Sequence, residues 1–160
     1  MKPKLQKTNA ARLLDKAGVK YELLAYDYDP EDLNACHTAE CLGVEPGRVF
    51  KTLVLEGEKT GYFVCVIPAD KEVDLKKAAV AASDKKAAMI PMKNLLSLTG
   101  YIRGGCTAVG MKKPFRVFFD QSALNYEEFY VSAGARGLQL KVSPTEFFAV
   151  VNGEAKDLTC

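Results

Sequence analysis

Lys51 stands inside an otherwise apolar run, residues 49–55, and is the most unusual chemical feature of this sequence. Side chains alternate between two faces of a strand, so Lys51 would share a face with Leu53 and Leu55. A lysine in that position can extend its ammonium to the edge of a sheet and remain solvated. Alternatively, it lines a pocket as a fixed cation that neutralises an anionic ligand and donates hydrogen bonds to it.

Two glycine-rich stretches offer complementary chemistry. Residues 100–110 contain four glycines and Tyr101, and residues 131–138 contain two glycines together with Ser132 and Arg136. Glycine allows a backbone to approach a ligand closely, and successive backbone N–H groups can converge on a carbonyl oxygen or a phosphate. The alternative for both stretches is a tight connection that only needs positive φ angles.

The familiar catalytic signatures are missing. His37 is the single histidine, so a Ser-His-Asp triad, a Cys-His dyad or a histidine-rich metal site would have to be built around it. It lies where a helix is expected to begin, which favours a capping or surface role. Cys36, His37 and Cys41 could be metal ligands, but no fourth partner is evident. Since there is also no Walker loop and no GxGxxG motif, we expect no metal and no cofactor.

The cysteines indicate a reducing compartment. Their number is odd and no CxxC pair occurs among Cys36, Cys41, Cys65, Cys106 and Cys160. Free thiols of this kind are typical of cytoplasmic proteins, and we therefore predict a cytoplasmic protein. Cys106 lies within the first glycine-rich stretch and is a candidate nucleophile, but no histidine near it in the sequence could activate it.

Charge and hydropathy exclude further classes. The net charge is +2, which is too small to indicate nucleic-acid binding by itself. Lysines concentrate between residues 71 and 113, where they form either a basic face or a solvated surface. No apolar run approaches the roughly 20 residues that cross a bilayer, and the basic start leads into polar residues instead of an apolar signal core. Membrane insertion and secretion are therefore not expected.

The elements that must position these residues are those of one domain. The chain has 160 residues, close to a typical domain of roughly 150, and we assign residues 1–160 to a single domain. The clearest element is a β-hairpin of residues 49–55 and 62–67. Strands and helices do not alternate regularly, so an α+β domain with a mixed, mainly antiparallel sheet is predicted. Further strands are expected at residues 21–26, 88–90, 117–119, 129–132 and 138–142. Helices are expected at residues 8–17, from His37 or Thr38 to Gly43, at 74–82, at 92–98, and from Ser143 through Val151.

The ordered set of motifs resembles the YbaK family of Cys-tRNA(Pro) deacylases. The resemblance covers about residues 8–158 and is carried by Tyr26-Asp27-Tyr28-Asp29-Pro30, Phe50-Lys51-Thr52-Leu53-Val54, Gly100-Tyr101 with Gly104-Gly105, Gly110-Met111-Lys112-Lys113, and Val131-Ser132 with Arg136-Gly137-Leu138. It implies a curved or barrel-like sheet with surrounding helices. The editing domain inserted in bacterial prolyl-tRNA synthetases shares this fold group.

The resemblance also implies an activity, which is trans-editing of cysteine wrongly attached to proline tRNA. In the family the substrate's own thiol is thought to attack the ester carbonyl, giving a cyclic thiolactone. Lys51 would then orient the terminal adenosine or its phosphate, while Gly104 and Gly105 would place backbone groups near the carbonyl. Substrate-binding roles would fall to Tyr26, Ser132, Tyr101 and Arg136.

Two departures from the family keep alternatives open. Ala108 replaces a proline of the loop, and Gln139 stands where some members carry an aspartate tied to activity. The chain could therefore edit another small aminoacyl-tRNA, such as Ala-tRNA(Pro), or bind aminoacyl-tRNA or its synthetase without turnover. The expected partner is the acceptor end of an aminoacyl-tRNA, with prolyl- or cysteinyl-tRNA synthetase as a candidate source of tRNA selectivity.

Overall fold

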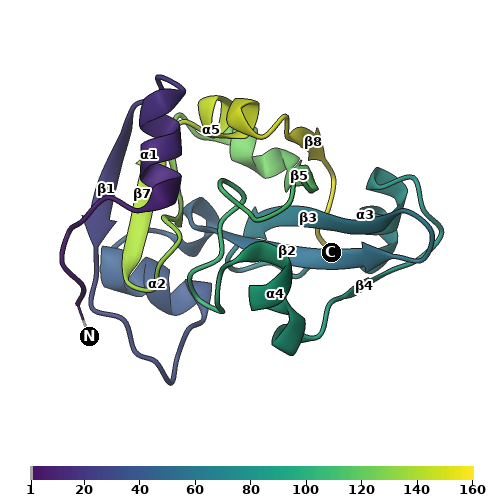
Figure 1. The fold of residues 1–160 in the computed structure, drawn as a ribbon, viewed down its shortest axis with the longest axis horizontal. Coiled ribbons are helices and arrows are strands. Elements are labelled where there is room, and N and C mark those ends of the chain that lie inside the picture. Colours follow the sequence, from purple (N-terminus) through teal and green to yellow (C-terminus); the bar gives the residue numbers. More distant parts are fainter. Residues whose placement is uncertain (1) are drawn as a thin grey trace.

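The computed structural model describes residues 2–160 and builds them from short helices and strands (Figure 1). The α-helices are α1 (Asn9–Lys16), α2 (Ala35–Leu42), α3 (Leu75–Ala81), α4 (Leu95–Thr99) and α5 (Pro144–Val150). The strands are β1 (Tyr21–Ala25), β2 (Phe50–Gly57), β3 (Gly61–Pro68), β4 (Ala87–Met89), β5 (Arg116–Asp120), β6 (Phe129–Ser132), β7 (Leu138–Val142) and β8 (Glu154–Lys156). Short 3₁₀ helices lie at Pro46–Arg48, Met92–Asn94 and Gln121–Asn125.

The strands form two sheets that meet at one point. The three-stranded sheet has the order β1-β7-β6 and is antiparallel throughout. The five-stranded sheet has the order β4-β2-β3-β5-β8, antiparallel from β4 to β3 and parallel from β3 to β8. A parallel bridge between Val49 and Tyr130 joins the start of β2 to β6. The predicted mixed, mainly antiparallel α+β architecture is therefore confirmed.

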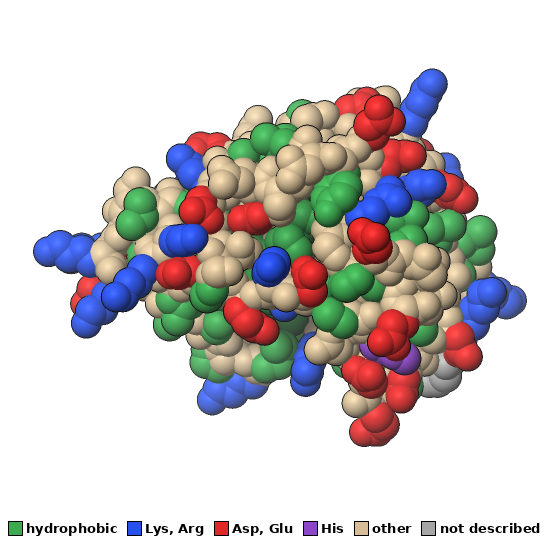
Figure 2. All heavy atoms as spheres, turned by 180° about the vertical axis from the view of Figure 1, so that it is seen from behind, with side chains coloured by type: hydrophobic (Ala, Val, Ile, Leu, Met, Phe, Trp, Pro, Cys, Tyr) green, Lys and Arg blue, Asp and Glu red, His purple; other side chains and the backbone are tan. Residues whose placement is uncertain are grey.

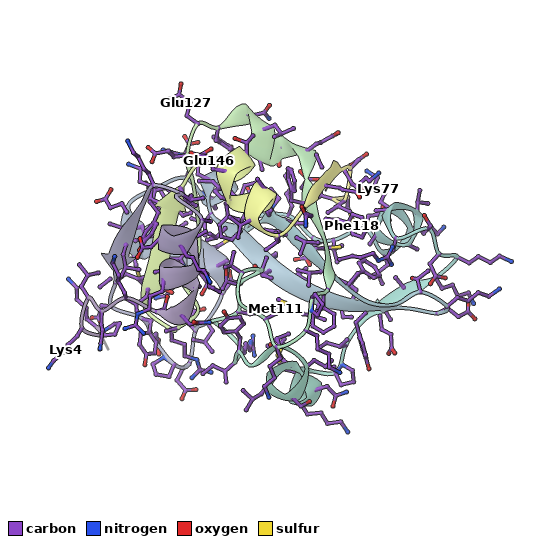
Figure 3. The ribbon with its side chains drawn as sticks, turned by 45° about the horizontal axis from the view of Figure 1, so that its top comes forward. Lys4, Lys77, Met111, Phe118, Glu127 and Glu146 are labelled. Atoms are coloured by element: carbon purple, nitrogen blue, oxygen red, sulfur yellow. The ribbon has the colours of Figure 1, made fainter. Side chains whose placement is uncertain are left out.

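Aromatic side chains from α5 tie the two sheets together. Phe148 stacks on Phe119 of β5 with ring centroids 3.9 Å apart, and it meets Phe129 of β6 edge-on at 5.5 Å. All three side chains belong to the largest core cluster, to which α1 contributes Leu14. Met111, in the middle of Figure 3, packs against the same cluster just after the first glycine-rich stretch. The core thus holds that stretch against the sheets.

Most predicted elements are confirmed, and the differences have local causes. The β2–β3 hairpin pairs from Phe50 with Pro68 to Gly57 with Gly61, as the apolar runs predicted. The predicted start of α2 is wrong, because Asn34 caps the helix by accepting a hydrogen bond from the Cys36 N–H. Strand β8 and the 3₁₀ helices at residues 46–48 and 121–125 were not predicted, since segments of three to five residues show no readable periodicity.

Within residues 2–160, no helix combines the length and the apolar character needed to cross a bilayer.

Asp84 fixes the far end of the β2–β3 hairpin. Its carboxylate accepts hydrogen bonds from the backbone N–H groups of Lys59 and Thr60, both at 2.9 Å, and from the Thr60 hydroxyl at 2.8 Å. These hydrogen bonds hold the pKa of Asp84 below its usual range. The main cause is the pair of hydrogen bonds from the backbone N–H groups of Lys59 and Thr60. The ionised carboxylate therefore stabilises the turn.

We expect Asp84→Asn to lower the free energy of unfolding, because the amide lacks the charge that strengthens these hydrogen bonds. A group whose folded pKa is depressed stabilises the protein above its unfolded pKa, about 4 for aspartate. The difference in free energy of unfolding between wild type and variant should therefore be largest at neutral pH and should shrink as the pH falls below about 4. Urea denaturation across this pH range measures it, and a gap that is unchanged at acid pH would contradict the assignment.

Candidate functional site

A cavity of about 290 Å³ opens where the two sheets meet. Its wall combines the start of β2, the end of β6, β7, the segment leading into α2, the first glycine-rich stretch, and the turn before α4. The lining residues are Leu33, Asn34, Ala35, Thr38, Val49, Phe50, Lys51, Thr52, Leu53, Met92, Leu95, Arg103, Gly104, Cys106, Ser132 and Gln139. The fold therefore brings three of the predicted site residues, Lys51, Gly104 and Ser132, into one cavity from distant parts of the chain.

Lys51 supplies a cation in this cavity. Its side chain is half-buried, and its Nζ donates a hydrogen bond to the carbonyl oxygen of Ala69 at 3.3 Å. No carboxylate among residues 2–160 forms an ion pair with it, and no Asp or Glu lines the cavity. The ammonium is therefore steered by a neutral carbonyl, and its charge is available to an anionic group that enters the cavity.

The two glycine-rich stretches pack closely against each other. Arg136 Nε donates to the carbonyl oxygen of Arg103 at 2.9 Å. A side chain on Gly105 would lie 3.1 Å from the backbone nitrogen of Arg136 and 3.2 Å from Ala135 Cα. The N–H of Gly105 itself donates to the Ile102 carbonyl oxygen at 2.9 Å. The structure thus uses Gly105 and Arg136, two predicted site residues, to pack one stretch against the other outside the cavity lining.

Tyr101 also serves this packing. Its hydroxyl donates to the carbonyl oxygen of Val109 at 2.5 Å and closes the first glycine-rich stretch. Its ring lies against Gly134, where a Cβ would come within 3.0 Å of the ring edge. Burial raises the pKa of the Tyr101 hydroxyl to about 12, so it remains protonated and a donor at neutral pH. Ala108, the position without the family's proline, is buried in the main core cluster, so the stretch is held by contacts that do not need that proline.

Gly104, Ser132 and Tyr26 occupy different places around the cavity. Gly104 lines it with φ +83° and has no hydrogen-bond partner for its N–H among residues 2–160. Ser132 lines it and accepts a hydrogen bond from the N–H of Gly134 at 3.1 Å. Tyr26 lies behind the wall, with its hydroxyl 3.4 Å from Thr38 Oγ1. Tyr26 therefore supports a lining residue and does not itself line the cavity.

Cys106 lines the cavity as a neutral thiol. Only 9% of its surface is exposed, and burial raises its pKa to about 12. Since the thiolate is the nucleophilic form, a thiol in this state is a poor nucleophile at neutral pH. No histidine lies in the cavity lining to remove its proton. The cavity therefore presents two cations, the half-buried Lys51 and the exposed Arg103, together with neutral polar groups, but no carboxylate or imidazole base.

His37 lies apart from this cavity, on an acidic surface. Its Nδ1 is 3.7 Å from Asp32 Oδ2 and 3.8 Å from Glu40 Oε2, and Figure 2 shows acidic side chains gathered around the single histidine. Cys41 Sγ is 3.6 Å from His37 Nε2, whereas Cys36 Sγ donates to the carbonyl of Ala69. Cys36 thus points away from the other two hypothetical metal ligands. Within residues 2–160, no three His, Cys, Asp or Glu side chains are grouped as a metal ion would require.

Comparison with known proteins identifies the family. Residues 32–149 match the model of the aminoacyl-tRNA editing domain. The chain belongs to the aminoacyl-tRNA editing domain family. This finding confirms the predicted resemblance and the predicted class, an editing enzyme that acts on aminoacyl-tRNA.

Individual relatives agree with this membership. An Enterococcus faecalis protein named "Putative Cys-tRNA(Pro)/Cys-tRNA(Cys) deacylase EbsC" is 44% identical over 96% of this chain and 94% of its own length. A proline–tRNA ligase of Fervidobacterium nodosum is 29% identical over 65% of this chain, which corresponds to 18% of the ligase. A crystal structure described as "a putative trans-editing enzyme for prolyl tRNA synthetase" superposes with a TM-score of 0.80 at 25% identity, covering 97% of this chain and 99% of that one. The superposition also confirms the predicted fold group.

Several lining residues were not predicted as site residues. Leu33, Asn34 and Thr38 lie in and after a segment that reads as an ordinary turn, and nothing in its composition distinguishes a cavity wall from a connection. Gln139 did carry a signal. It stands where some members of the family carry an aspartate, although the alternation of residues 138–142, with Gln139 and Lys141 on one face, is typical of a strand that exposes that face.

We expect Gly105→Ala to separate the two glycine-rich stretches, because its Cβ would meet rigid backbone atoms. Overpacking of this kind costs about 1–3 kcal/mol, measurable by urea denaturation, and hydrogen exchange of residues 100–110 should accelerate. The matched control is Gly47→Ala, whose Cβ would meet only the Tyr126 hydroxyl at 3.3 Å. Equal stability and equal exchange in the two variants would refute the interlocking role.

Proposed function

We propose that this chain is a single-domain trans-editing deacylase that releases cysteine from mischarged Cys-tRNA(Pro). The observation that carries the proposal is a small cavity with a cation, Lys51, and a lining without carboxylate or imidazole. Such a cavity can bind and orient an ester, but it offers no base to activate water. This suits a substrate that carries its own nucleophile, and the cysteine thiol is one. The name of the Enterococcus faecalis relative supports the same substrate.

In the proposed reaction the thiol of the bound cysteine attacks its own ester carbonyl. A carbon–sulfur bond forms, the bond from the carbonyl carbon to the tRNA 3′ oxygen breaks, and the thiol proton ends on that oxygen. The products are tRNA with a free 3′ hydroxyl and a cyclic thiolactone, which water then opens to cysteine. The protein contributes by holding thiol and carbonyl together and by stabilising the developing oxyanion.

Each predicted site residue has a proposed part in this reaction. Lys51 orients the terminal adenosine or its phosphate through its unpaired charge. The unpartnered N–H of Gly104 faces the oxyanion, and Ser132 forms part of the wall around the aminoacyl group. Four residues support the site from behind the lining, namely Tyr26, Tyr101, Gly105 and Arg136. Their contacts, to Thr38 and between the two glycine-rich stretches, support this positioning role.

The alternatives are less favoured by the cavity. An alanine ester has no thiol, and the lining offers no imidazole or carboxylate that could activate water in its place. An assay of amino-acid release from a panel of charged tRNAs distinguishes an enzyme, which releases amino acid, from a binding module, which does not. We therefore place Ala-tRNA(Pro) second to Cys-tRNA(Pro).

The proposed partner is the acceptor end of the charged tRNA. Arg103 lines the cavity as an exposed cation, and exposed Lys93 follows the lining residue Met92. Cations at the opening can contact phosphates of the acceptor end. A domain of this size does not extend to an anticodon as well, so we infer that prolyl- or cysteinyl-tRNA synthetase supplies the tRNA selectivity. We further infer that the chain works in the cytoplasm, where free thiols such as its five cysteines persist.

We expect Lys51→Ala to lower the rate of cysteine release by about 10²–10³-fold, the loss typical when one charged or donor group of a preorganised site is removed. The fold should be retained, because a half-buried ammonium is itself costly to desolvate. Release of labelled cysteine from Cys-tRNA(Pro) and circular dichroism measure the two effects. The matched control is Lys141→Ala, also on a strand but outside the cavity lining, with its Nζ 3.9 Å from Glu128 Oε1. A folded Lys51→Ala protein with wild-type turnover would exclude this role.

We expect the substrate's sulfur, and no thiol of the protein, to do the chemistry. Cys-tRNA should be cleaved, whereas Ser-tRNA, which offers a hydroxyl in place of the thiol, should largely survive. A variant that lacks every cysteine should keep its activity if it folds, with substitutions at Cys36, Cys41, Cys65, Cys106 and Cys160. Loss of activity in this variant, followed by recovery when Cys106 alone is restored, would assign the reaction to an enzyme thiol instead.

A further inference from the structure

Gln139 is a buried polar residue in the cavity wall with an unsatisfied acceptor. Its exposed fraction is 5%, and its Oε1 has no hydrogen-bond partner among residues 2–160. It lies on β7 directly opposite Ser132 of β6, and both residues line the cavity. Two neighbouring strands thus present a carboxamide and a hydroxyl to the same space.

An orphan oxygen at this depth is unusual. Buried polar atoms are nearly always hydrogen-bonded, and leaving one unpaired is unfavourable for the free protein. The Ser132 hydroxyl accepts a hydrogen bond from the Gly134 N–H, and no donor, Ser132 included, lies within hydrogen-bond distance of Gln139 Oε1 among residues 2–160. The Gln139 oxygen is therefore an unpaired acceptor just beneath the cavity surface, and a small rotation of the carboxamide would present it to a donor that arrives with a ligand.

The chemistry of the cavity narrows the identity of that donor. A charged aminoacyl-tRNA brings an α-ammonium and a ribose hydroxyl to the ester. Because no carboxylate lines the cavity, the ammonium has only neutral oxygens to bind. An amide oxygen that accepts from an ammonium forms a charge-assisted hydrogen bond, which is stronger than one accepted from a neutral hydroxyl.

We propose that Gln139 Oε1 accepts a hydrogen bond from the α-ammonium of the aminoacyl group. This inference rests on the proposed function and names the feature of the substrate that the site recognises. A free amine is present on aminoacyl-tRNA but absent from peptidyl-tRNA, whose nitrogen is acylated. The orphan oxygen therefore favours aminoacyl-tRNA, whichever amino acid it carries, over N-acylated tRNA.

The test compares two proteins on two substrates. Wild type and Gln139→Met are assayed for kcat/KM on Cys-tRNA(Pro) and on N-acetyl-Cys-tRNA(Pro), which keeps the thiol and the ester. Acetylation should cost wild type about 30-fold, within the range for a hydrogen bond to a charged group. Gln139→Met should lose a similar factor on Cys-tRNA(Pro) and little more on the acetylated substrate. If the losses in kcat/KM from acetylation and from Gln139→Met multiply when the two changes are combined, they are independent and the proposal is overturned.

Further variants separate the remaining explanations. Gln139→Glu keeps acceptor oxygens and has no donor when ionised, so this variant should retain the preference for the free amine. If Gln139→Glu loses that preference, residue 139 donates a hydrogen bond to the substrate and the proposal is wrong. Gln121→Met, on an exposed residue outside the cavity lining, is the matched control and should behave as wild type. If Gln139→Met instead abolishes discrimination against Cys-tRNA(Pro) ending in 2′-deoxyadenosine, the partner is the ribose hydroxyl and the ammonium assignment is wrong.

Two readouts do not depend on turnover. Removing an orphan acceptor should raise the melting temperature of Gln139→Met by about 3 °C, whereas a structural role would lower it. Calorimetry with the non-hydrolysable amide 3′-cysteinylamino-3′-deoxyadenosine should give about 30-fold weaker binding to the variant, and no such difference with its N-acetyl form. If wild type binds this probe but releases no cysteine, the proposed function fails while the inference stands. Equal binding by both proteins overturns the inference alone.

Discussion

A parallel bridge between Val49 and Tyr130 joins the two sheets, and the cavity lies at this junction. The join is reinforced by Phe50, whose ring centroid is 5.2 Å from that of Phe129. Arg48 adds a cation 5.4 Å from the centre of the Tyr130 ring. Because Lys51 comes two residues after the bridge and Ser132 two residues after it on the other strand, the register there fixes the distance between two walls of the site. A slip of one residue in either strand would turn the site residue of that strand to the opposite face.

The rest of the site is positioned by backbone packing more than by side-chain chemistry. The two glycine-rich stretches approach so closely that Gly105 cannot carry a Cβ without displacing Ala135 or Arg136. This packing holds Gly104 at the cavity while the sheets hold Lys51 and Ser132. The protein therefore provides a rigid frame of neutral dipoles and one half-buried cation, which suits a reaction in which the substrate brings its own nucleophile.

The parts of this structure that could be predicted are those with a local signal. The hairpin was predictable because both of its strands show continuous apolar runs around a turn, and Lys51 because it interrupts one of them. Tyr101 and Arg136 were predicted to bind substrate, yet their contacts join the two glycine-rich stretches. A glycine-rich sequence signals close backbone approach but does not say whether a ligand or another part of the chain approaches. The α2 start at Asn34 was missed because several polar residues in a row could serve as the cap.

The neutral state of the Cys106 thiol has a consequence for work with sulfur compounds. Disulfide exchange and peroxide oxidation both require a thiolate. A cavity that admits cysteine esters brings the Cys106 sulfur close to every substrate molecule and to any cystine that enters the cavity. Since burial raises the pKa of Cys106 to about 12, little thiolate is present at neutral pH, and disulfide exchange or oxidation of this wall residue is slow.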